Sequence, residues 1–425
     1  MRKFLILICL VIGLPLRAGT PEQVVSDWYR LTLELVRHTP TYSPPVAARA
    51  YGYLGVIAWE VAASQDGDLT SLAGQLTGLE PLPVRPDGLD QGVILGAALS
   101  LAAHELFANT GPTGQRAMGA MAKQVDAEAS AGLSPDLVAD SAAYGQAVAR
   151  QVLDWAATDG GAAVENMGFP MTWTTSTAPG HWVPTSAVIQ QQAPLLPDWG
   201  NNRPMAMPAG TDCGLPPPPA YSEEPGSAFY REALEVRDAV KNLTPEQEAI
   251  ARFWSDDPML SPTPPGHWIS VVLNILDEQD ADFVTRADVL ARLGIAVNDA
   301  FIGCWRSKFQ YDLIRPVTYI RAHIDPKFEP PLITPPFPEY PSGHSVQSGA
   351  AAEVLTALFG DNFAFDDPTH EDDGLAARHF TSFYAAAEEA AISRMYGGIH
   401  FRSAIDDGLA QGKCIGAYAA GLKTK

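Results

Sequence analysis

The sequence predicts a mostly α-helical protein: two four-helix-bundle-like halves joined by long loops rich in proline and glycine, with little or no β-structure. Apolar residues recur at three- and four-residue spacing in long segments at both ends of the chain, as on the buried face of a helix. The alternation typical of strands is nearly absent, and no repeat of fixed period is present. With 425 residues, 46% of them hydrophobic, the chain is long enough to bury a large core.

The first 18 residues have the layout of a secretory signal peptide. Arg2 and Lys3 precede an apolar run, residues 4–16, that is too short to span a bilayer. We therefore expect export to the periplasm or the medium, with no stable membrane association after cleavage. Leu16 stands where a small residue is preferred before the cleavage point, which leaves an uncleaved anchor as the alternative.

Residues 19–157 are expected to form an N-terminal helical bundle. This part is rich in Ala, Leu, Val and Glu with the apolar spacing of helices. The predicted helices are 21–37, 45–63, 92–109, 114–131 and 135–158, and their arrangement is typical of an antiparallel bundle.

Residues 158–227 are expected to form an extended, ordered arm packed on the helices. Glycine, proline and tryptophan dominate this segment, and four consecutive prolines, 216–219, block any long helix. Apolar aromatic residues such as Trp182 and Trp199 argue against a flexible polar linker.

Helical patterning resumes in residues 228–425, which we expect to form a C-terminal helical bundle carrying the functional site. The apolar periodicity there is again that of helices with one buried face. The predicted helices are 229–241, 244–254, 269–279, 285–310, 343–359, 381–396 and 403–421.

The charge of the chain restricts its partners. The formal net charge is −21, and it becomes −24 when the three cations of the leader are removed. An acidic surface argues against nucleic acid as a partner, and any anion site must be a local concentration of cations. The sequence leaves open whether the chain forms a homo-oligomer.

Three cysteines follow the leader: Cys213, Cys304 and Cys414. An oxidising compartment permits one disulfide and leaves one thiol over, but the spacing does not choose the pair. No Cys/His cluster indicates a zinc site.

A first basic motif contains Lys308 and Arg315. The two residues are seven positions apart, about two helical turns, so both cations are predicted to project from one helical face. Pro316 disfavours continuation of that helix. Taken alone, a solvated helix face explains this pair of charges.

A second motif contains Ser342, Gly343 and His344, which precede a strongly helical stretch. Ser342 is expected at or beside the N-cap, where unpaired N–H groups and the positive end of the helix dipole attract anions. Gly343 lets an anion approach the backbone without a Cβ in the way. In isolation, Ser342 serves simply as a cap and His344 as a surface residue.

A third motif contains Arg394 and His400. On a straight helix these side chains would point about 240° apart. The pair Gly397 and Gly398 is predicted to end the helix and turn the chain, and residues 403–406 resemble the capping start of the next helix.

Together, the three motifs resemble the signature shared by vanadium haloperoxidases and acid phosphatases of the phosphatidic acid phosphatase type 2 (PAP2) superfamily: Lys-x6-Arg-Pro, Pro-Ser-Gly-His and Ser-Arg-x5-His. The resemblance implies that the protein binds vanadate. Phosphate can occupy the same site. The resemblance also implies that the oxyanion is held by Lys308, Arg315, Ser342, Gly343 and Arg394. It further implies that His400 binds vanadium axially and that His344 is the acid/base.

This pocket serves two chemistries in the families that it resembles. In the peroxidase, vanadate activates hydrogen peroxide for attack by a halide, and hypohalous acid is released. In the phosphatase, His400 attacks the phosphorus of a phosphate ester to form a phosphohistidine, while His344 protonates the leaving alcohol. A non-catalytic oxyanion-binding protein is a third interpretation.

Features outside the motifs favour the peroxidase, because the resemblance to secreted haloperoxidases extends over most of residues 30–420. Trp305 and Phe337 match aromatic positions that line the halide side of the pocket in chloroperoxidase-like members. Asp257 resembles the carboxylate that supports a vanadate-binding arginine, here Arg394. Core packing explains either aromatic residue equally well. The halide preference and the natural substrate stay open.

One position departs from the family pattern. The family usually has an acidic residue four positions after the axial histidine, where this chain has Ala404. We expect Asp406 or Asp407 to replace the missing carboxylate. Without a replacement, oxyanion affinity would fall by about 10–100-fold.

Overall fold

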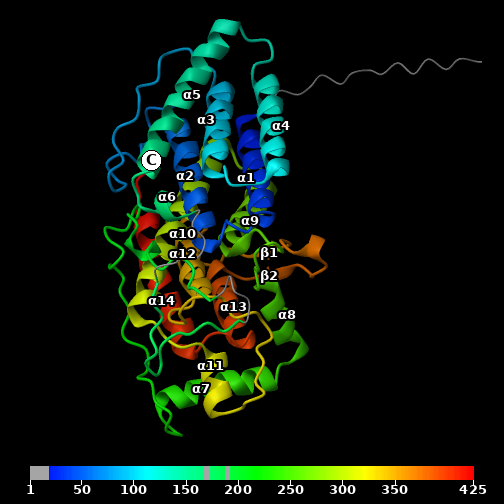
Figure 1. Cartoon of the computed structure of the whole chain (residues 1–425). Coiled ribbons are helices and arrows are strands. Elements are labelled where there is room, and N and C mark those ends of the chain that lie inside the picture. The colour runs from blue at the N-terminus through cyan, green and yellow to red at the C-terminus, as the bar shows by residue number, and fades with distance from the viewer. Residues whose placement is uncertain (1–18, 166–172, 187–191) are drawn as a thin grey trace, which may run out of the picture.

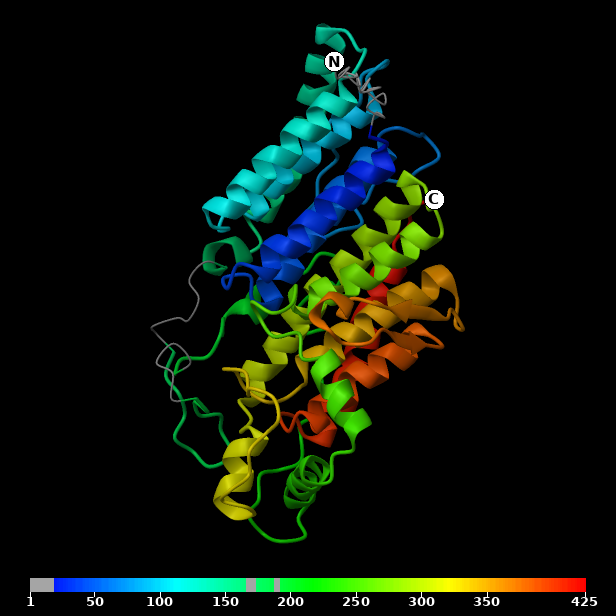
Figure 2. The same ribbon diagram turned by 90° about the vertical axis from the view of Figure 1, so that its right-hand side faces the viewer.

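The computed structural model describes residues 19–165, 173–186 and 192–425, and its architecture is mostly α-helical (Figures 1 and 2). Within these ranges, the named strands are two of three residues each, β1 (Phe365–Asp367) and β2 (Arg378–Phe380), which pair antiparallel. The predicted fold class is therefore confirmed. The predicted signal peptide lies outside the described residues. None of the described helices has the length and apolar character needed to cross a membrane.

The N-terminal helices form one end of an elongated molecule (Figure 1). They are α1 (Pro21–Arg37), α2 (Pro44–Ala63), α3 (Gln91–Leu106), α4 (Pro112–Ala129) and α5 (Pro135–Ala156), followed by the short α6 (Gly161–Val164). Helix α1 begins with a capping box, in which the side chains of Thr20 and Gln23 each accept the other residue's backbone N–H. All five long helices lie close to their predicted ranges.

The C-terminal part contains most of the remaining helices. They are α7 (Ala228–Lys241), α8 (Pro245–Phe253), α9 (Thr263–Glu278), α10 (Phe283–Tyr311), α11 (Pro316–His323), α12 (Gly343–Phe359), α13 (Phe383–Tyr396) and α14 (Arg402–Ala420), with the 3-10 turn η3 (Glu371–Asp373). The 3-10 turn η2 (Trp199–Asn201) lies in the arm. In Figure 1, α7 and α11 lie at the end of the molecule opposite to α3 and α5.

Proline explains the two largest differences from the predicted helices. Helix α11 was not predicted, because Pro316 was interpreted only as the end of a helix. Pro316 instead occupies the first position of α11, where its missing N–H needs no partner. Helix α9 begins at residue 263 rather than 269, because Pro264 and Pro265 lie in its first turn, where proline is tolerated.

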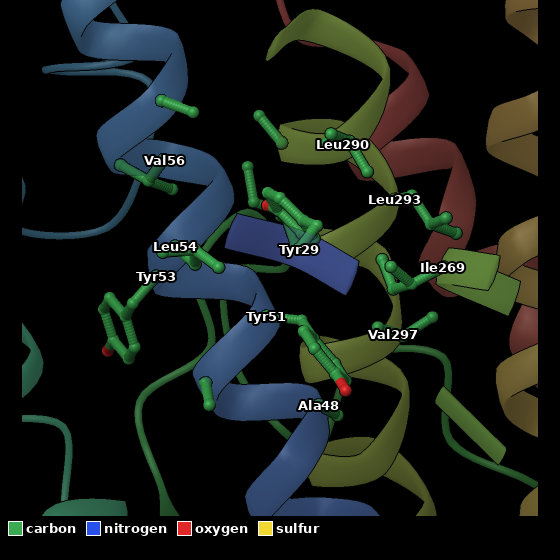
Figure 3. Close-up of a cluster of buried hydrophobic side chains, with 14 of the residues drawn as sticks. Tyr29, Ala48, Tyr51, Tyr53, Leu54, Val56, Ile269, Leu290, Leu293 and Val297 are labelled. Carbon is green, nitrogen blue, oxygen red and sulfur yellow. The ribbon is translucent and has the colours of Figure 1, made fainter. Parts of the chain in front are cut away.

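One hydrophobic core runs through both predicted halves. Helix α2 lies along α10, and Tyr51 and Leu54 pack with Leu290 and Val297 in a buried cluster (Figure 3). The approach is close at Gly55, where a Cβ would lie 2.7 Å from the Cα of Ala291. The predicted halves therefore share their core, although they are separate in the sequence.

The described part of the arm lies against α10. The buried carboxylate of Asp299 accepts the backbone N–H groups of Met205, Ala206 and Met207 at 2.7–2.8 Å. Burial raises the pKa of Asp299 to about 6, against the effect of these hydrogen bonds. Farther along α10, the N–H of buried Trp182 donates to the carbonyl of Asp312 at 2.8 Å.

A disulfide joins the arm to the last helix. It links Cys213 with Cys414 of α14, 201 residues later, and leaves Cys304 as a buried free thiol on α10. The structure therefore decides a pairing that the sequence left open.

The contact between α12 and α14 yields a stability prediction. A Cβ on Gly412 would lie 2.0 Å from the carbonyl oxygen of Val346, so Gly412→Ala must push α14 away from α12. We expect a loss of about 1–3 kcal/mol in the free energy of unfolding, measured with urea. Gly119→Ala in α4 is the control, since no atom lies within 4 Å of its Cβ and alanine favours a helix. Equal effects of the two substitutions would contradict this packing.

Candidate active site

The second and third predicted motifs line one cavity of about 550 Å³, and Arg315 of the first motif lies behind its wall, with Nη1 3.2 Å from Nε2 of His400. Gly343, His344, Arg394 and His400 lie in its wall. Most of the remaining wall is apolar and comes from distant parts of the chain: Pro40, Pro44, Leu195, Leu196, Leu260, Pro264, Phe301, Trp305, Ile333 and Phe337. The cavity is therefore an apolar chamber with a polar, basic end.

The first turn of α12 supplies the backbone part of the site. Ser342 is the N-cap, as predicted, and its hydroxyl accepts the N–H of Ser345 at 3.3 Å. Gly343 opens the helix, where backbone N–H groups have no acceptor within the helix. A Cβ at Gly343 would lie 3.9 Å from Trp305 and Phe301, so nothing but the aromatic wall bounds this side.

Lys308 and Arg315 do not project from one helix. Helix α10 ends at Tyr311, and Asp312 follows in the left-handed region with φ of 45°. Arg315 is the N-cap of α11, so the prediction that both cations share a helical face is wrong. The turn between the helices, rather than helical periodicity, brings both side chains to the site.

The ammonium group of Lys308 holds the loop that precedes α12. It donates to the carbonyls of Pro338 and Glu339, each at 3.0 Å, and to that of Pro341. These bonds match the three N–H groups of the ammonium. Burial lowers the pKa of Lys308 to about 7. Lys308 therefore anchors this loop, and all three N–H groups of its ammonium donate to carbonyls of the loop.

Arg315 and Arg394 retain unpaired N–H groups in the protein interior. Arg315 donates from Nε to the carbonyl of Phe337 and from Nη1 to that of Ile399, both at 2.9 Å, while its Nη2 has no partner. Nε and Nη2 of Arg394 also have no partner. Burial lowers the pKa of each guanidinium to about 10, so both stay charged at neutral pH. Unpaired buried donors are costly, so these atoms mark a place for an anion.

Arg394 and His400 lie on either side of the predicted glycine turn. Helix α13 ends at Tyr396, and Gly398 follows with φ of 73°, a conformation that favours glycine. The predicted capping role of Ser403 is wrong, because α14 begins at Arg402 and the hydroxyl of Ser403 donates to Glu232 at 2.8 Å.

Glu339 fixes the ring of His400. Nδ1 of His400 donates to the Glu339 carboxylate at 2.8 Å, and the N–H of Phe401 donates to the same oxygen at 2.8 Å. Burial, and then the charge of Arg315, hold the pKa of His400 well below its usual range. The ring is therefore neutral, and its Nε2 lone pair lies 3.2 Å from Nη1 of Arg315. A lone pair in this position suits a ligand of a metal centre.

Asp406 or Asp407 was expected to replace the acid missing at Ala404, but the carboxylate that contacts His400 is Glu339. Asp406 points to solvent, with 62% of its side chain exposed, and lies 3.8 Å from Arg402. Asp407 accepts the hydroxyl of Tyr340 at 2.9 Å. Neither carboxylate is a partner of His400, whose Nδ1 bonds to Glu339. The sequence analysis did not select Glu339. Its position, three residues before Ser342 of the second motif, is the signal that could have identified it.

His344 faces both a cation and a carboxylate. Nη1 of Arg394 donates to its Nε2 at 3.0 Å, and a carboxylate oxygen of Asp256 lies 3.7 Å from the same nitrogen. Burial and the charge of Arg394 lower the pKa of His344 to about 4. The ring is neutral at physiological pH and is able to accept a proton.

Asp256, which the sequence analysis did not select, is the buried carboxylate at this end of the cavity. It accepts hydrogen bonds from His267 at 3.0 Å and from His370 at 3.3 Å. Asp257 lines the cavity and supports Arg394 through its charge rather than through a hydrogen bond, since Nη1 of Arg394 donates to Ser255 and His344. His267 lies 11 positions after Asp256 and His370 lies 114 positions after it, and no spacing rule connects the three residues.

Trp305 and Phe337 form an aromatic wall of the cavity, with ring centroids 5.0 Å apart. The indole N–H of Trp305 donates to the carbonyl of Leu195 at 3.1 Å. Nζ of Lys308 and Cζ of Arg315 each lie 5.0 Å from the centre of the Phe337 ring. The rings therefore combine an apolar surface with a nearby positive charge, an environment that suits a large, weakly hydrated anion.

Comparison with known proteins gives consistent results. Residues 288–425, which include all three motifs, match the family described as the VCPO second helical-bundle domain. The vanadium chloroperoxidase of Curvularia inaequalis is 26% identical over 258 residues, and the vanadium-dependent bromoperoxidase of Ascophyllum nodosum is 36% identical over 94 residues. These matches cover 44% and 19% of this chain, and only 42% and 17% of the two relatives.

Solved structures extend the similarity to nearly the whole chain. A bacterial vanadium-dependent iodoperoxidase superimposes with a TM-score of 0.86 at 37% identity, covering 95% of this chain and 97% of that one. An apo-type bacterial vanadium-dependent chloroperoxidase superimposes with a TM-score of 0.70 over 91% of this chain and 95% of that one. The two sequences are 16% identical, so this superposition shows a common fold and nothing more.

The two candidate partners of His400, Glu339 and Asp406, are distinguished by three substitutions. Glu339→Ala removes the acceptor that orients the ring, so we expect vanadate affinity to fall by about 10–100-fold. Glu339→Gln retains an acceptor oxygen and is expected to lose less. Asp406→Asn should leave the affinity unchanged, because Asp406 does not contact His400. Titration of the purified protein with vanadate by calorimetry measures all three, and the reverse order would contradict the geometry.

Proposed function

The chain belongs to the vanadium haloperoxidase family, and we propose that it oxidises halide with hydrogen peroxide, using vanadate held at His400. In this reaction hydrogen peroxide, halide and a proton give hypohalous acid and water. The observation that carries the proposal is the orientation of His400. Its Nδ1 proton is fixed on Glu339, which leaves the Nε2 lone pair directed to the basic end of the cavity.

The side chains around His400 fit a tetrahedral oxyanion. Nη2 of Arg315, together with Nε and Nη2 of Arg394, would donate to its oxygens, as would the N-terminus of α12 at Gly343. Lys308 would hold the loop before α12 in place beside the oxyanion, since its donors bond to three carbonyls of that loop. Bound vanadate would act as a Lewis acid toward hydrogen peroxide.

His344 would move the protons of the reaction. Its ring is neutral above about pH 4 and lies at the cavity wall, so it would accept a proton from hydrogen peroxide as that molecule binds. The protonated ring, stabilised by Asp256, would return the proton to the leaving oxygen. Arg394 fixes the ring in place through Nη1.

We propose iodide as the preferred halide. The bacterial relative that aligns over nearly its whole length at 37% identity is described as an iodoperoxidase. Iodide is also the most easily oxidised and the least hydrated of the common halides. The wall of Trp305, Phe337 and Pro336 offers an apolar surface of the kind that such an ion tolerates.

We also propose that the protein is exported. The basic and apolar leader, residues 1–18, supports export. The disulfide between Cys213 and Cys414 is of the kind that persists in oxidising compartments.

The activity is tested with vanadate-free protein and with protein reconstituted with vanadate. We expect oxidation of iodide by hydrogen peroxide only after reconstitution, with lower kcat/KM for bromide and chloride, and its loss in His400→Ala. Ser403→Ala is a control close to His400 that leaves the cavity intact. Hydrolysis of p-nitrophenyl phosphate by the vanadate-free protein, without halide oxidation, would instead support the phosphatase and overturn the proposal.

The role of His344 predicts a pH dependence. Because the pKa of His344 is about 4, its basic form is lost as the pH falls through that value. We therefore expect kcat/KM for hydrogen peroxide to decrease below about pH 4, with folding monitored by circular dichroism. His344→Ala should have a low kcat/KM without this decrease. The same acidic limb in the variant would show that another group titrates.

A further inference from the structure

A network of histidines and carboxylates continues from Asp256, which is the only one of its members that lines the cavity. His267 of α9 contacts Asp256 through Nδ1 at 3.0 and 3.1 Å, and contacts Asp367 of β1 through Nε2 at 2.8 Å. His370 contacts Asp256 through Nε2 at 3.3 Å and Asp373 through Nδ1 at 3.1 Å. Asp256 is therefore held by two imidazoles, each of which is held in turn by a second carboxylate.

The geometry fixes the protonation of His267. Carboxylates accept hydrogen bonds, so each ring nitrogen that faces one must carry a proton, and the ring is an imidazolium. Its side chain is fully buried, and Trp254 stacks on it with centroids 4.5 Å apart and an angle of 23°. Burial lowers the pKa of His267, but Asp256 and Asp367 outweigh burial and raise it to about 10.

Asp256, His267 and His370 also have the composition of a metal site. A metal ion would take the lone pairs of one nitrogen from each ring. In this structure those nitrogens already face Asp256, and no side-chain atom of the three residues is among the buried polar atoms left without a partner in the described ranges. The contacts therefore favour a self-sufficient hydrogen-bonded network over a metal site.

The backbone at Asp256 is strained, which indicates that its position matters. Asp256 has φ of 49°, in the left-handed region, which costs a residue other than glycine about 1–3 kcal/mol. The surrounding hydrogen bonds offset this cost and direct the carboxylate to α9 and α12. The charged and titratable groups that face the Asp256 carboxylate are Asp257, His267, His344, His370 and Arg394.

We propose that His267 and His370 are positioning residues, which hold the carboxylate of Asp256 ionised and fixed behind His344 and Arg394. A carboxylate held in this way raises the basicity of His344 without forming an ion pair that would occupy the free N–H groups of Arg394. Neither positioning residue lines the cavity. The proposal rests on the proposed function, but its first test does not need vanadate or turnover.

The protonation of His267 is measured directly by NMR of protein labelled with ¹⁵N in histidine. At pH 8 we expect a signal from a histidine with both nitrogens protonated that is present in the wild type and lost in His267→Gln. His379→Gln is the matched control, since His379 lies on β2 and pairs with exposed Asp366 outside the network. A neutral His267 at pH 8, or a stoichiometric metal ion in the purified wild-type protein that is lost in His267→Gln, would overturn the proposal.

The stability of the protein gives a second readout. The folded state raises the pKa of His267 to about 10. The protonated ring therefore contributes its full share to the free energy of unfolding below the unfolded-state pKa, about 6.5, and this contribution is lost as the pH rises toward 10. The difference in the free energy of unfolding between wild type and His267→Gln should therefore shrink across this range. His267→Gln/Asp367→Asn removes one charge of each sign and should recover part of the lost stability if His267→Gln folds poorly.

Kinetics separate a positioning role from a purely structural one. In folded, vanadate-loaded His370→Gln and His267→Gln/Asp367→Asn, we expect kcat to fall by about tenfold or more, with little change in KM for halide. The acidic limb assigned to His344 should move to lower pH, because Asp256 raises the pKa of that ring. Kinetics and pH profiles equal to those of His379→Gln would overturn the positioning role. Absence of turnover in every protein, wild type included, would overturn the proposed function, while the NMR result would still decide the network.

Discussion

The site depends on keeping two buried guanidinium groups charged and incompletely paired. Arg315 and Arg394 are almost fully buried, and three of their nitrogens have no partner. Burying a charge is costly unless it is compensated, so a direct ion pair would be the ordinary solution. Here the nearest carboxylates bond to histidines instead: Glu339 to His400, and Asp256 to His267. The charge of Asp256 lowers the cost of burying Arg394 through space, while the donors of both guanidinium groups stay available to an anion.

The loop before α12 connects most of these groups. Its carbonyls accept from Lys308 and Arg315, its Glu339 orients His400, and its Phe337 forms part of the cavity wall. The loop ends at Ser342, which caps the helix whose N-terminus faces the cavity. One short segment thus fixes both Arg315 and His400, and Lys308 donates to three of its carbonyls.

The N-terminal helices also contribute to the site. Pro40 and Pro44, at the start of α2, line the same cavity as His400. Helix α2 is held against α10 by close packing at Gly55, and α10 carries Lys308 and Trp305. The shape of the apolar chamber therefore depends on the shared core, although the groups proposed to bind the oxyanion all belong to the C-terminal part.

The sequence by itself determined the helical fold, most helix positions, and the residues that gather at the basic end of the cavity. These features follow from local rules: apolar periodicity, the N-cap at Ser342, and the glycine turn between Arg394 and His400. The tertiary structure decided the partners. Glu339 rather than Asp406 supports His400, Asp256 lies beside His344, and His267 is held as a cation between two carboxylates. Such contacts join residues up to about a hundred positions apart, and they depend on the direction in which each helix presents its side chains. Spacing along the chain does not encode that direction, so only the packed structure reveals it.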